Sequence, residues 1–202
     1  YMSGHPLTQY ARILEQYRLT DVKGLGQIQD RSVTRIGGIV SVVDRKISKN
    51  TKEPWAAVTL EDMDGTVEVL AFPDTYQNYG SFILQDAAIL VCGEVQKRDE
   101  QTKIIAQEIY PLGDAPKHFA ERLGIHIAAA KLNDGMIEKV KDILLSHPGT
   151  TPVIVCLQFP TGEKVFVDTD IRMKVLADEK LLHALERELG ENGVHVVISR
   201  NP

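Results

Sequence analysis

The stretch that decides the fold is VTLEDMDGTVEVLAFPDTY, Val58 to Tyr76. Apolar and polar residues alternate over residues 58–61 and again over 67–70, which is the pattern of two half-buried strands. Between them lies Asp62-Met63-Asp64-Gly65, which suits a tight turn, because glycine tolerates positive φ and aspartate side chains hydrogen-bond the turn backbone. Pro73 then fits the first turn of a short helix. The stretch therefore predicts a hairpin followed by a helix, which is typical of a small β-barrel.

The flanking sequence completes a five-stranded barrel. Residues 33–47 read as one long strand, and Gly37-Gly38 inside it are expected to mark the bulge or sharp coil that a closing barrel needs. Two more strands are expected at residues 87–97 and 102–110. The order β-β-β-α-β-β, with the helix between the third and fourth strands, is the order of the OB-fold. We therefore assign residues 31–112 to an OB-fold domain with five strands and one helix.

The apolar pattern changes after the barrel. Residues 113–119 contain glycine and proline and read as a linker. Residues 120–202 then follow the order β-α-β-β-α-β, which predicts a small α+β domain with helices on one side of a sheet. The ferredoxin-like fold has this element order, although order alone does not fix a topology. Residues 1–30 have helical spacing and are expected to be a connector from an absent part of a longer protein.

Composition limits the classes of function. The chain has 202 residues and a formal net charge of −5, and its hydrophobic fraction of 43% is ordinary for a soluble globular protein. We expect a cytoplasmic protein without membrane contact, because no apolar run approaches the roughly 20 residues that span a bilayer and no secretory leader is recognisable. Cys92 and Cys156 lie in separate apolar strands, where buried free thiols are expected. The acidic balance disfavours nucleic-acid binding over the whole surface and requires a local basic patch.

Two groups of cations border the groove expected for an OB-fold. Residues 45–52 contain four cations and no acid, and the single tryptophan follows them. Cations attract phosphates, and an aromatic ring stacked on a base contributes about 1–3 kcal/mol. The second group surrounds the turn between the fourth and fifth strands. The candidate nucleic-acid-binding residues are Arg45, Lys46, Lys49, Lys52 and Trp55 in the first group, Lys97, Arg98 and Lys103 in the second, and Arg35 on the first strand.

Each group also has a plainer interpretation. The first group fits a solvated loop with the tryptophan packed on the barrel rim. The second fits a charged turn, since Asp99 and Glu100 lie beside it, and Arg35 faces either the groove or solvent. Residues 31–112 contain nine cations and twelve carboxylates, so we expect the barrel alone to bind nucleic acid weakly.

The sequence predicts no catalytic residue, no metal site and no cofactor in this fragment. Asp168-Thr169-Asp170 resembles a paired-carboxylate motif, but no third ligand is spaced to support it, and a turn is favoured there. Turn chemistry is also favoured over a divalent ion at residues 61–64. The histidines lack metal-ligand spacing, and no nucleophile motif or phosphate loop is present. In the last domain, residues 165–167 and the leucines of residues 181–185 are candidates for a partner surface, with core the favoured interpretation.

Several segments resemble one known family. GGIVSVVDRKISK (37–49), the hairpin stretch quoted first and ILVCGEVQKRDEQTKIIAQEIYPL (89–112) resemble the OB domain near the C-terminus of bacterial DNA polymerase III alpha subunits. YMSGHPLTQY (1–10) resembles the segment that joins the polymerase body to that domain, and LLSHPGTTPVIVCL (144–157) resembles the final domain. The resemblance implies a fragment of a replicative DNA-directed DNA polymerase, a nucleotidyltransferase whose catalytic residues lie upstream. It implies that the OB domain contacts single-stranded template DNA and that the final domain binds the clamp-loader tau subunit of the replisome.

Two other functions remain open. An RNA-binding OB module of the tRNA-anticodon-binding type fits the strands equally well, although a synthetase would continue into a large catalytic domain. A non-nucleic-acid interaction module fits the net negative charge.

Overall fold

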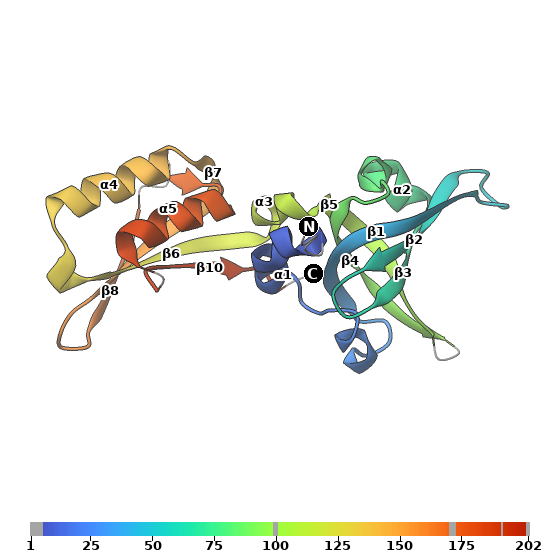
Figure 1. The fold of residues 1–202 in the computed structure, drawn as a ribbon, viewed down its shortest axis with the longest axis horizontal. Helices are drawn as coiled ribbons and strands as arrows, with labels where there is room; N and C mark the ends of the chain where they lie inside the picture. Colours follow the sequence, from blue (N-terminus) through green and yellow to red (C-terminus); the bar gives the residue numbers. More distant parts are fainter. Residues whose placement is uncertain (1–5, 99–100, 170–172, 191, 201–202) are drawn as a thin grey trace, which may run out of the picture. The chain divides into compact units, whose positions relative to one another are not determined.

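The computed structural model describes residues 6–98, 101–169, 173–190 and 192–200 (Figure 1). The chain divides into two compact units, one reaching to Ala115 and one spanning Pro116–Ser199. Each unit has its own hydrophobic core. Among the described helices, none has the length and apolar content needed to cross a membrane.

The first unit contains a closed barrel with the strand order β1-β2-β3-β5-β4. β3 and β5 are parallel, and the other neighbouring strands are antiparallel. A helix, α2, and the 3-10 turn η3 connect β3 to β4. This arrangement confirms the predicted OB-fold. The elements are β1 (Val33–Ile47), β2 (Pro54–Glu61), β3 (Thr66–Ala71), α2 (Pro73–Tyr79), η3 (Gly80–Phe82), β4 (Ala88–Arg98) and β5 (Gln101–Pro111).

The alternation seen in the hairpin decides which side chains fill the barrel. Val58, Leu60, Val67 and Val69 are each at most 5% exposed and belong to the barrel core. Full burial of such a side chain contributes about 1.5–3 kcal/mol. The alternate positions of the same strands therefore face out of the barrel core.

The acidic turn between β2 and β3 is held by one buried carboxylate. Asp62 accepts hydrogen bonds from the backbone N–H groups of Asp64 (2.8 Å) and Gly65 (3.1 Å). Its second carboxylate oxygen accepts a hydrogen bond from the backbone N–H of Val22 (2.8 Å). The carboxylate is thus occupied by backbone donors, which supports the turn interpretation of this acidic stretch.

The irregularity of β1 lies further along the strand than predicted. The register with β2 shifts between Val40 and Val42. Gly37 and Gly38 serve close packing: a Cβ on Gly38 would lie 2.5 Å from the backbone oxygen of Glu61, and one on Gly37 would lie 2.5 Å from a methyl carbon of Leu14. Only glycine fits at position 38, because the atom it approaches is backbone.

The residues before β1 pack on the barrel. They form η1 (Pro6–Tyr10), α1 (Ala11–Tyr17) and η2 (Gly24–Gln27), and their large side chains Leu7, Leu14, Tyr17 and Leu25 are at most 4% exposed. Arg35 of β1 lies beneath them, fully buried, and its Nε donates a hydrogen bond of 2.6 Å to the backbone oxygen of Tyr17. Burial lowers the pKa of Arg35. This buried donor fastens the segment to the barrel.

The second unit is an α+β layer pair, as predicted. Its sheet has the order β10-β6-β7-β8, with β9 pairing to β7. β6 and β7 are adjacent and parallel, which differs from the ferredoxin-like arrangement. Residues predicted as a linker form the helical turns η4 and α3. The elements are η4 (Leu112–Asp114), α3 (Ala115–Phe119), β6 (Ala120–Ala128), η5 (Ala129–Lys131), α4 (Asp134–Leu145), β7 (Pro148–Gln158), β8 (Lys164–Asp168), β9 (Lys174–Val175), α5 (Glu179–Leu189) and β10 (Val194–Ile198).

Helices α4 and α5 cover one face of this sheet (Figure 1). Each begins at a polar cap: Asn133 accepts a hydrogen bond from the Met136 N–H and Asp178 one from the Leu181 N–H, both at 2.9 Å. The leucines of residues 181–185 are buried, so they form core as expected. Residues 165–167 of β8 are exposed instead, so their assignment to the core is wrong.

Candidate nucleic-acid interface

The outward positions of β1, β2, β3 and β5 form one continuous face, called here the outer sheet face. Ala57 on β2 pairs with Asp44 on β1 and with Leu70 on β3, and Leu70 pairs with Ile105 on β5. None of these side chains belongs to the barrel core cluster. In the neighbouring row, Trp55 pairs with Lys46. The face is therefore apolar at its centre and reaches the basic loop at one end.

Two aromatic rings stand at that end. The ring centroids of Trp55 and Phe72 lie 5.8 Å apart with an interplanar angle of 39°, and Phe72 is 44% exposed. The two rings border a pocket of about 570 Å³, which the side chains of Lys46, Ile47, Ser48, Lys49 and Pro73 complete. Phe72 was not among the predicted site residues. Phe72 follows the last residue of β3 and lies two residues beyond Leu70, so continuing the alternation of that strand places it on this face.

The side chain of Lys46 interacts with two neighbouring residues, Asp44 and Trp55. Its Nζ lies 2.8 Å from the carboxylate of Asp44 and 5.3 Å from the centre of the Trp55 ring. The hydrogen bond to Asp44 raises the pKa of Lys46. The charge of Lys46 is thus offset locally by Asp44, and the ammonium lies within cation–π distance of the indole ring.

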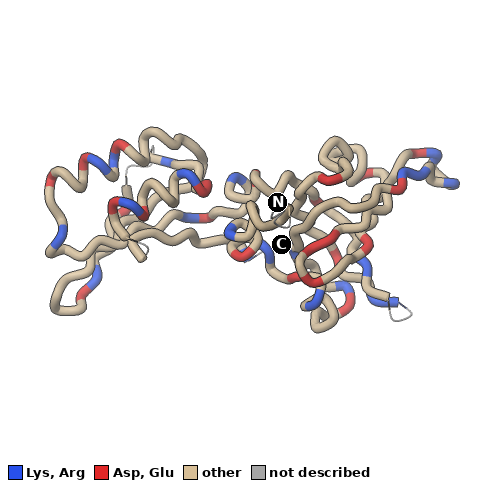
Figure 2. Tube along the Cα trace, in the orientation of Figure 1, with Lys and Arg blue, Asp and Glu red and all other residues tan. Residues whose placement is uncertain are grey.

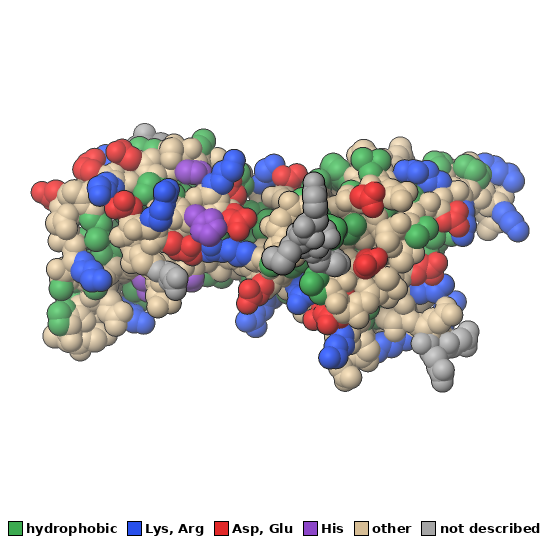
Figure 3. All heavy atoms as spheres, in the orientation of Figure 1, with side chains coloured by type: hydrophobic (Ala, Val, Ile, Leu, Met, Phe, Trp, Pro, Cys, Tyr) green, Lys and Arg blue, Asp and Glu red, His purple; other side chains and the backbone are tan. Residues whose placement is uncertain are grey.

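The loop between β1 and β2 carries the least compensated positive charge of the face. Lys49 and Lys52 are exposed, and no carboxylate pairs with them among the described residues. Figures 2 and 3 show Lys and Arg gathered at the tip of this loop. Lys52 has a φ of 61°, which fixes the bend of the loop. Arg45 has a different role, since it donates hydrogen bonds to the Tyr76 hydroxyl (3.1 Å) and the Ile83 backbone oxygen (3.0 Å) and so joins β1 to α2 and to the residue that follows η3.

The second predicted group is more dispersed. Lys103 forms an ion pair of 2.5 Å with Glu68 across β3 and β5. The Nζ of Lys97 donates a hydrogen bond of 2.7 Å to the backbone oxygen of Gly26. Arg98 is exposed at the end of β4, next to residues 99–100, which lie outside the described residues. The prediction that Arg35 faces the groove or solvent is wrong, because α1 covers it and its exposure is 0%.

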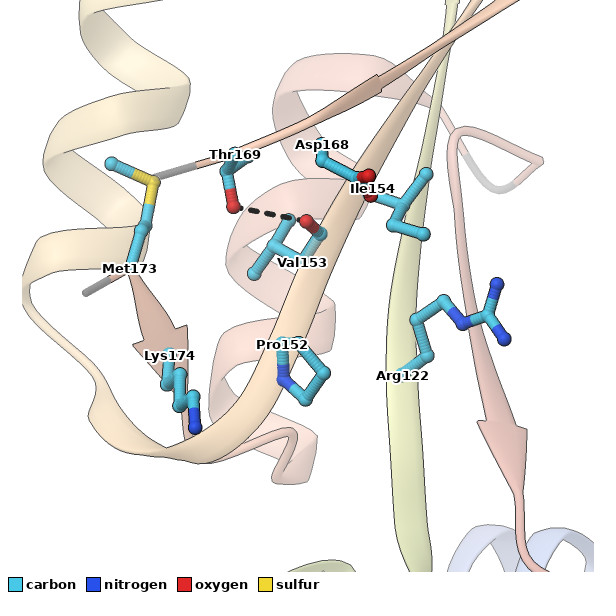
Figure 4. A pocket seen from close by; sticks show the side chains of 8 residues that line it. All are labelled: Arg122, Pro152, Val153, Ile154, Asp168, Thr169, Met173 and Lys174. Carbon is cyan, nitrogen blue, oxygen red and sulfur yellow. Dashed lines mark hydrogen bonds between the residues drawn. The ribbon is translucent and has the colours of Figure 1, made fainter. Parts of the chain in front are cut away.

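The second unit offers a pocket of about 380 Å³ beside β7, drawn in Figure 4. Arg122, Asp168 and Lys174 bring charges of both signs to it, and the Thr169 hydroxyl is occupied by a 2.9 Å hydrogen bond to the Val153 backbone oxygen. The apolar side chains are those of Pro152, Val153, Ile154 and Met173. This donor set contains no paired nucleophile and base. Asp170 of the proposed turn lies outside the described residues.

Two cysteines and a pair of histidines are the other groups considered as possible sites. Cys92 and Cys156 are buried and free, and burial raises the pKa of the Cys92 thiol to about 11. His126 and His195 meet edge to face, with ring centroids 4.7 Å apart. Partial burial, His126 and Arg122 lower the pKa of His195. Across the described part of the chain, no group of three metal-ligating side chains comes together.

Comparison with known proteins agrees with this geometry. Residues 34–112 match the family described as OB-fold nucleic acid binding domain. The chain is 31% identical over 193 residues to DNA polymerase III subunit alpha of Mycobacterium tuberculosis (strain CDC 1551 / Oshkosh), an alignment that covers 94% of this chain and 16% of that protein. It is 34% identical over 169 residues to DNA polymerase III subunit alpha of Saccharopolyspora erythraea, covering 80% of this chain and 14% of that protein.

The chain therefore spans about a sixth of the length of the relatives it matches. Among solved structures, a replication protein A heterotrimer bound to ssDNA aligns with 46% of this chain and 79% of that chain, at 15% identity and a TM-score of 0.37. That likeness is too distant to bear on function. The sequence matches confirm the predicted resemblance: residues 34–112 are similar to OB-fold nucleic acid binding domains, and nearly the whole chain is similar to one segment of DNA polymerase III alpha subunits.

Proposed function

We propose that this chain is a segment of a replicative DNA polymerase alpha subunit and that its barrel contacts single-stranded DNA through the outer sheet face. The observation that carries the proposal is the ring pair formed by half-buried Trp55 and exposed Phe72, which lies beside the exposed cations Lys49 and Lys52. Aromatic platforms next to cations are how barrels of this kind hold single strands, because every base has a π face and every phosphate a charge.

In this proposal the bases and the phosphates meet different parts of the face. One base enters the pocket beside Trp55 and Phe72, and the following bases lie on the apolar centre at Leu70 and Ile105. The phosphates approach the loop that carries Lys49 and Lys52. Few uncompensated cations are available and the barrel carries more carboxylates than cations, so the barrel positions a strand rather than sequestering it. The nucleotidyl transfer itself would belong to parts of the protein that this sequence does not include.

A fluorescence anisotropy titration with a labelled DNA strand of about 16 nucleotides, the upper site size of one OB-fold, tests the barrel. We expect weak, salt-sensitive binding that the variant Trp55→Ala weakens further. An RNA strand of the same sequence and a folded tRNA serve as competitors. Preference for tRNA would replace the proposal by the RNA-binding alternative, and no binding of any strand at low salt would replace it by a protein-interaction role.

The second unit is proposed, on the resemblance alone, to dock the clamp-loader tau subunit. Co-sedimentation of the chain with purified tau tests this role. If no complex forms even at high protein concentration, the docking role is wrong. This outcome does not depend on the result of the DNA titration.

A further inference from the structure

Strand β8 (Lys164–Asp168) is an open edge with an exposed apolar centre. Val165, Phe166 and Val167 are 46%, 66% and 45% exposed. β7 is the strand that pairs with β8, and within the described part of the chain no other strand does. The register with β7 is unbroken from residue 164 to residue 168, and the strand contains no proline. Such an edge presents unpaired backbone groups to any strand that can match it.

The direction of those backbone groups follows from the contacts with β7. The N–H of Phe159 donates to the oxygen of Glu163 (2.9 Å), and the N–H of Thr169 donates to the oxygen of Val153 (3.4 Å). Hydrogen-bonding direction alternates along an antiparallel strand, so the odd-numbered residues bond β7. The N–H and C=O groups of Lys164, Phe166 and Asp168 therefore point to the open edge.

The sequence of this strand is complementary to itself. In KVFVD, an antiparallel copy centred on Phe166 places Lys164 opposite Asp168, Val165 opposite Val167 and Phe166 opposite Phe166. Lys164, Phe166 and Asp168 share one face of the strand, and the two valines share the other. The same register places the three outward-pointing residues of each copy opposite one another. Charge, apolar contact and hydrogen-bond direction thus agree in one alignment.

We propose that β8 is the contact strand of a twofold-symmetric pairing between two copies of this chain. The isologous arrangement uses one patch on both copies, so the two Lys164–Asp168 pairs form simultaneously. A second copy is the occupant that supplies both opposite charges at the correct ends of a five-residue strand. The contact is a single strand of five residues, so we expect the pairing to be weak for free chains. It becomes effective where two copies are held near one another.

Charge reversal tests the register directly, with analytical ultracentrifugation of the full chain over a range of concentrations as the assay. Each single variant, Lys164→Asp or Asp168→Lys, replaces two attractive pairs with two repulsive ones, and we expect it to weaken self-association about tenfold. The double variant Lys164→Asp/Asp168→Lys restores both pairs and returns the association to that of the parent chain. The matched control is Lys141→Asp/Glu138→Lys, which reverses an exposed pair on α4 of the same unit and leaves association unchanged.

Amide hydrogen exchange provides the second measurement. Raising the protein concentration is expected to slow exchange at Lys164, Phe166 and Asp168, while exchange at Val165 and Val167 stays constant because those amides already bond β7. A chain that remains monomeric at millimolar concentration overturns the proposal and leaves the edge to a different strand. Self-association that the double variant fails to rescue, or that leaves these three amides unchanged, overturns it as well.

Discussion

Removing the two exposed cations of the basic loop, Lys49 and Lys52, should change how the affinity of the barrel for DNA depends on salt. The variant Lys49→Gln/Lys52→Asn neutralises both charges, and asparagine suits position 52 because it tolerates the φ of 61° found there. Of the nine predicted site residues, eight are cations, and five of these are buried, ion-paired or hydrogen-bonded to the protein. Lys49, Lys52 and Arg98 remain to neutralise phosphates.

The magnitude follows from counterion release. Three phosphates neutralised on a single strand give a slope of log affinity against log salt of about −2, and one phosphate gives about −0.7. Between 50 and 200 mM salt, the parent chain should therefore lose affinity by about 20-fold and the double variant by about threefold. Fluorescence anisotropy with a labelled DNA strand at four or more salt concentrations, roughly spanning that range, measures both slopes.

The matched control is Lys23→Gln/Arg31→Asn, which removes two cations that precede β1 and so do not belong to the outer sheet face. Arg31 has a φ of 64°, so its replacement by asparagine copies the backbone change at position 52. An unchanged slope in the loop variant, or an equal flattening in the control, would refute the assignment of the phosphate contacts to the loop.

Three further predictions concern single side chains. Trp55→Ala or Phe72→Ala should weaken single-strand binding by about 1–3 kcal/mol with an unchanged salt slope, since stacking releases no ions; the same anisotropy series measures it. Arg35→Met should lower the free energy of unfolding in urea by roughly 2 kcal/mol through loss of its charged hydrogen bond, without altering the slope of DNA binding by the folded protein. The lowered pKa of His195 means that the unfolded chain takes up the proton first as pH falls, so the second unit should be fully stable above about pH 6.5 and lose stability below it.

Each of these predictions has an outcome that contradicts it. A flattened salt slope in either aromatic variant would show that the ring holds a phosphate-binding side chain in place rather than a base. Unchanged stability of Arg35→Met would contradict the fastening role of the buried guanidinium. For the histidine, the control is His195→Gln, whose thermal midpoint should fall less than that of the parent chain between pH 7.5 and 5.5, values that roughly bracket the ordinary histidine pKa. Equal falls in both proteins would contradict the assignment.

The barrel could be predicted because its information is local. The alternation over residues 58–61 and 67–70, with a turn between them, predicts two strands, the register in which they pair and the side chains that face the core. The same rule applied two residues further would have added Phe72 to the candidate site. Local alternation does not show whether a predicted cation is free to bind phosphate. Lys103, for example, is paired with Glu68, which becomes its neighbour only through the parallel pairing of β3 and β5.

The errors share one cause, which is that burial depends on what packs above a residue. Arg35 occupies a strand position that the pattern places correctly, but α1 covers it, and no spacing along the strand reports that cover. For residues 165–167 the error is the reverse: a run of apolar residues is typical of a buried strand, but these side chains are exposed. They belong to β8, which is an edge strand of the sheet. The order of elements along the chain does not predict which strand lies at the edge.

Two hydrogen bonds join the segment before β1 to the barrel, and they limit how far the N-terminus of a recombinant barrel can be shortened. A truncation that starts at the first strand would discard the Tyr17 oxygen that receives Arg35 and the Val22 N–H that caps Asp62. A buried guanidinium and a buried carboxylate would each lose a hydrogen-bond partner in the same protein, at a cost of a few kcal/mol against a total stability of about 5–15. A recombinant barrel should therefore begin before Leu7, even though every strand of it lies after residue 32.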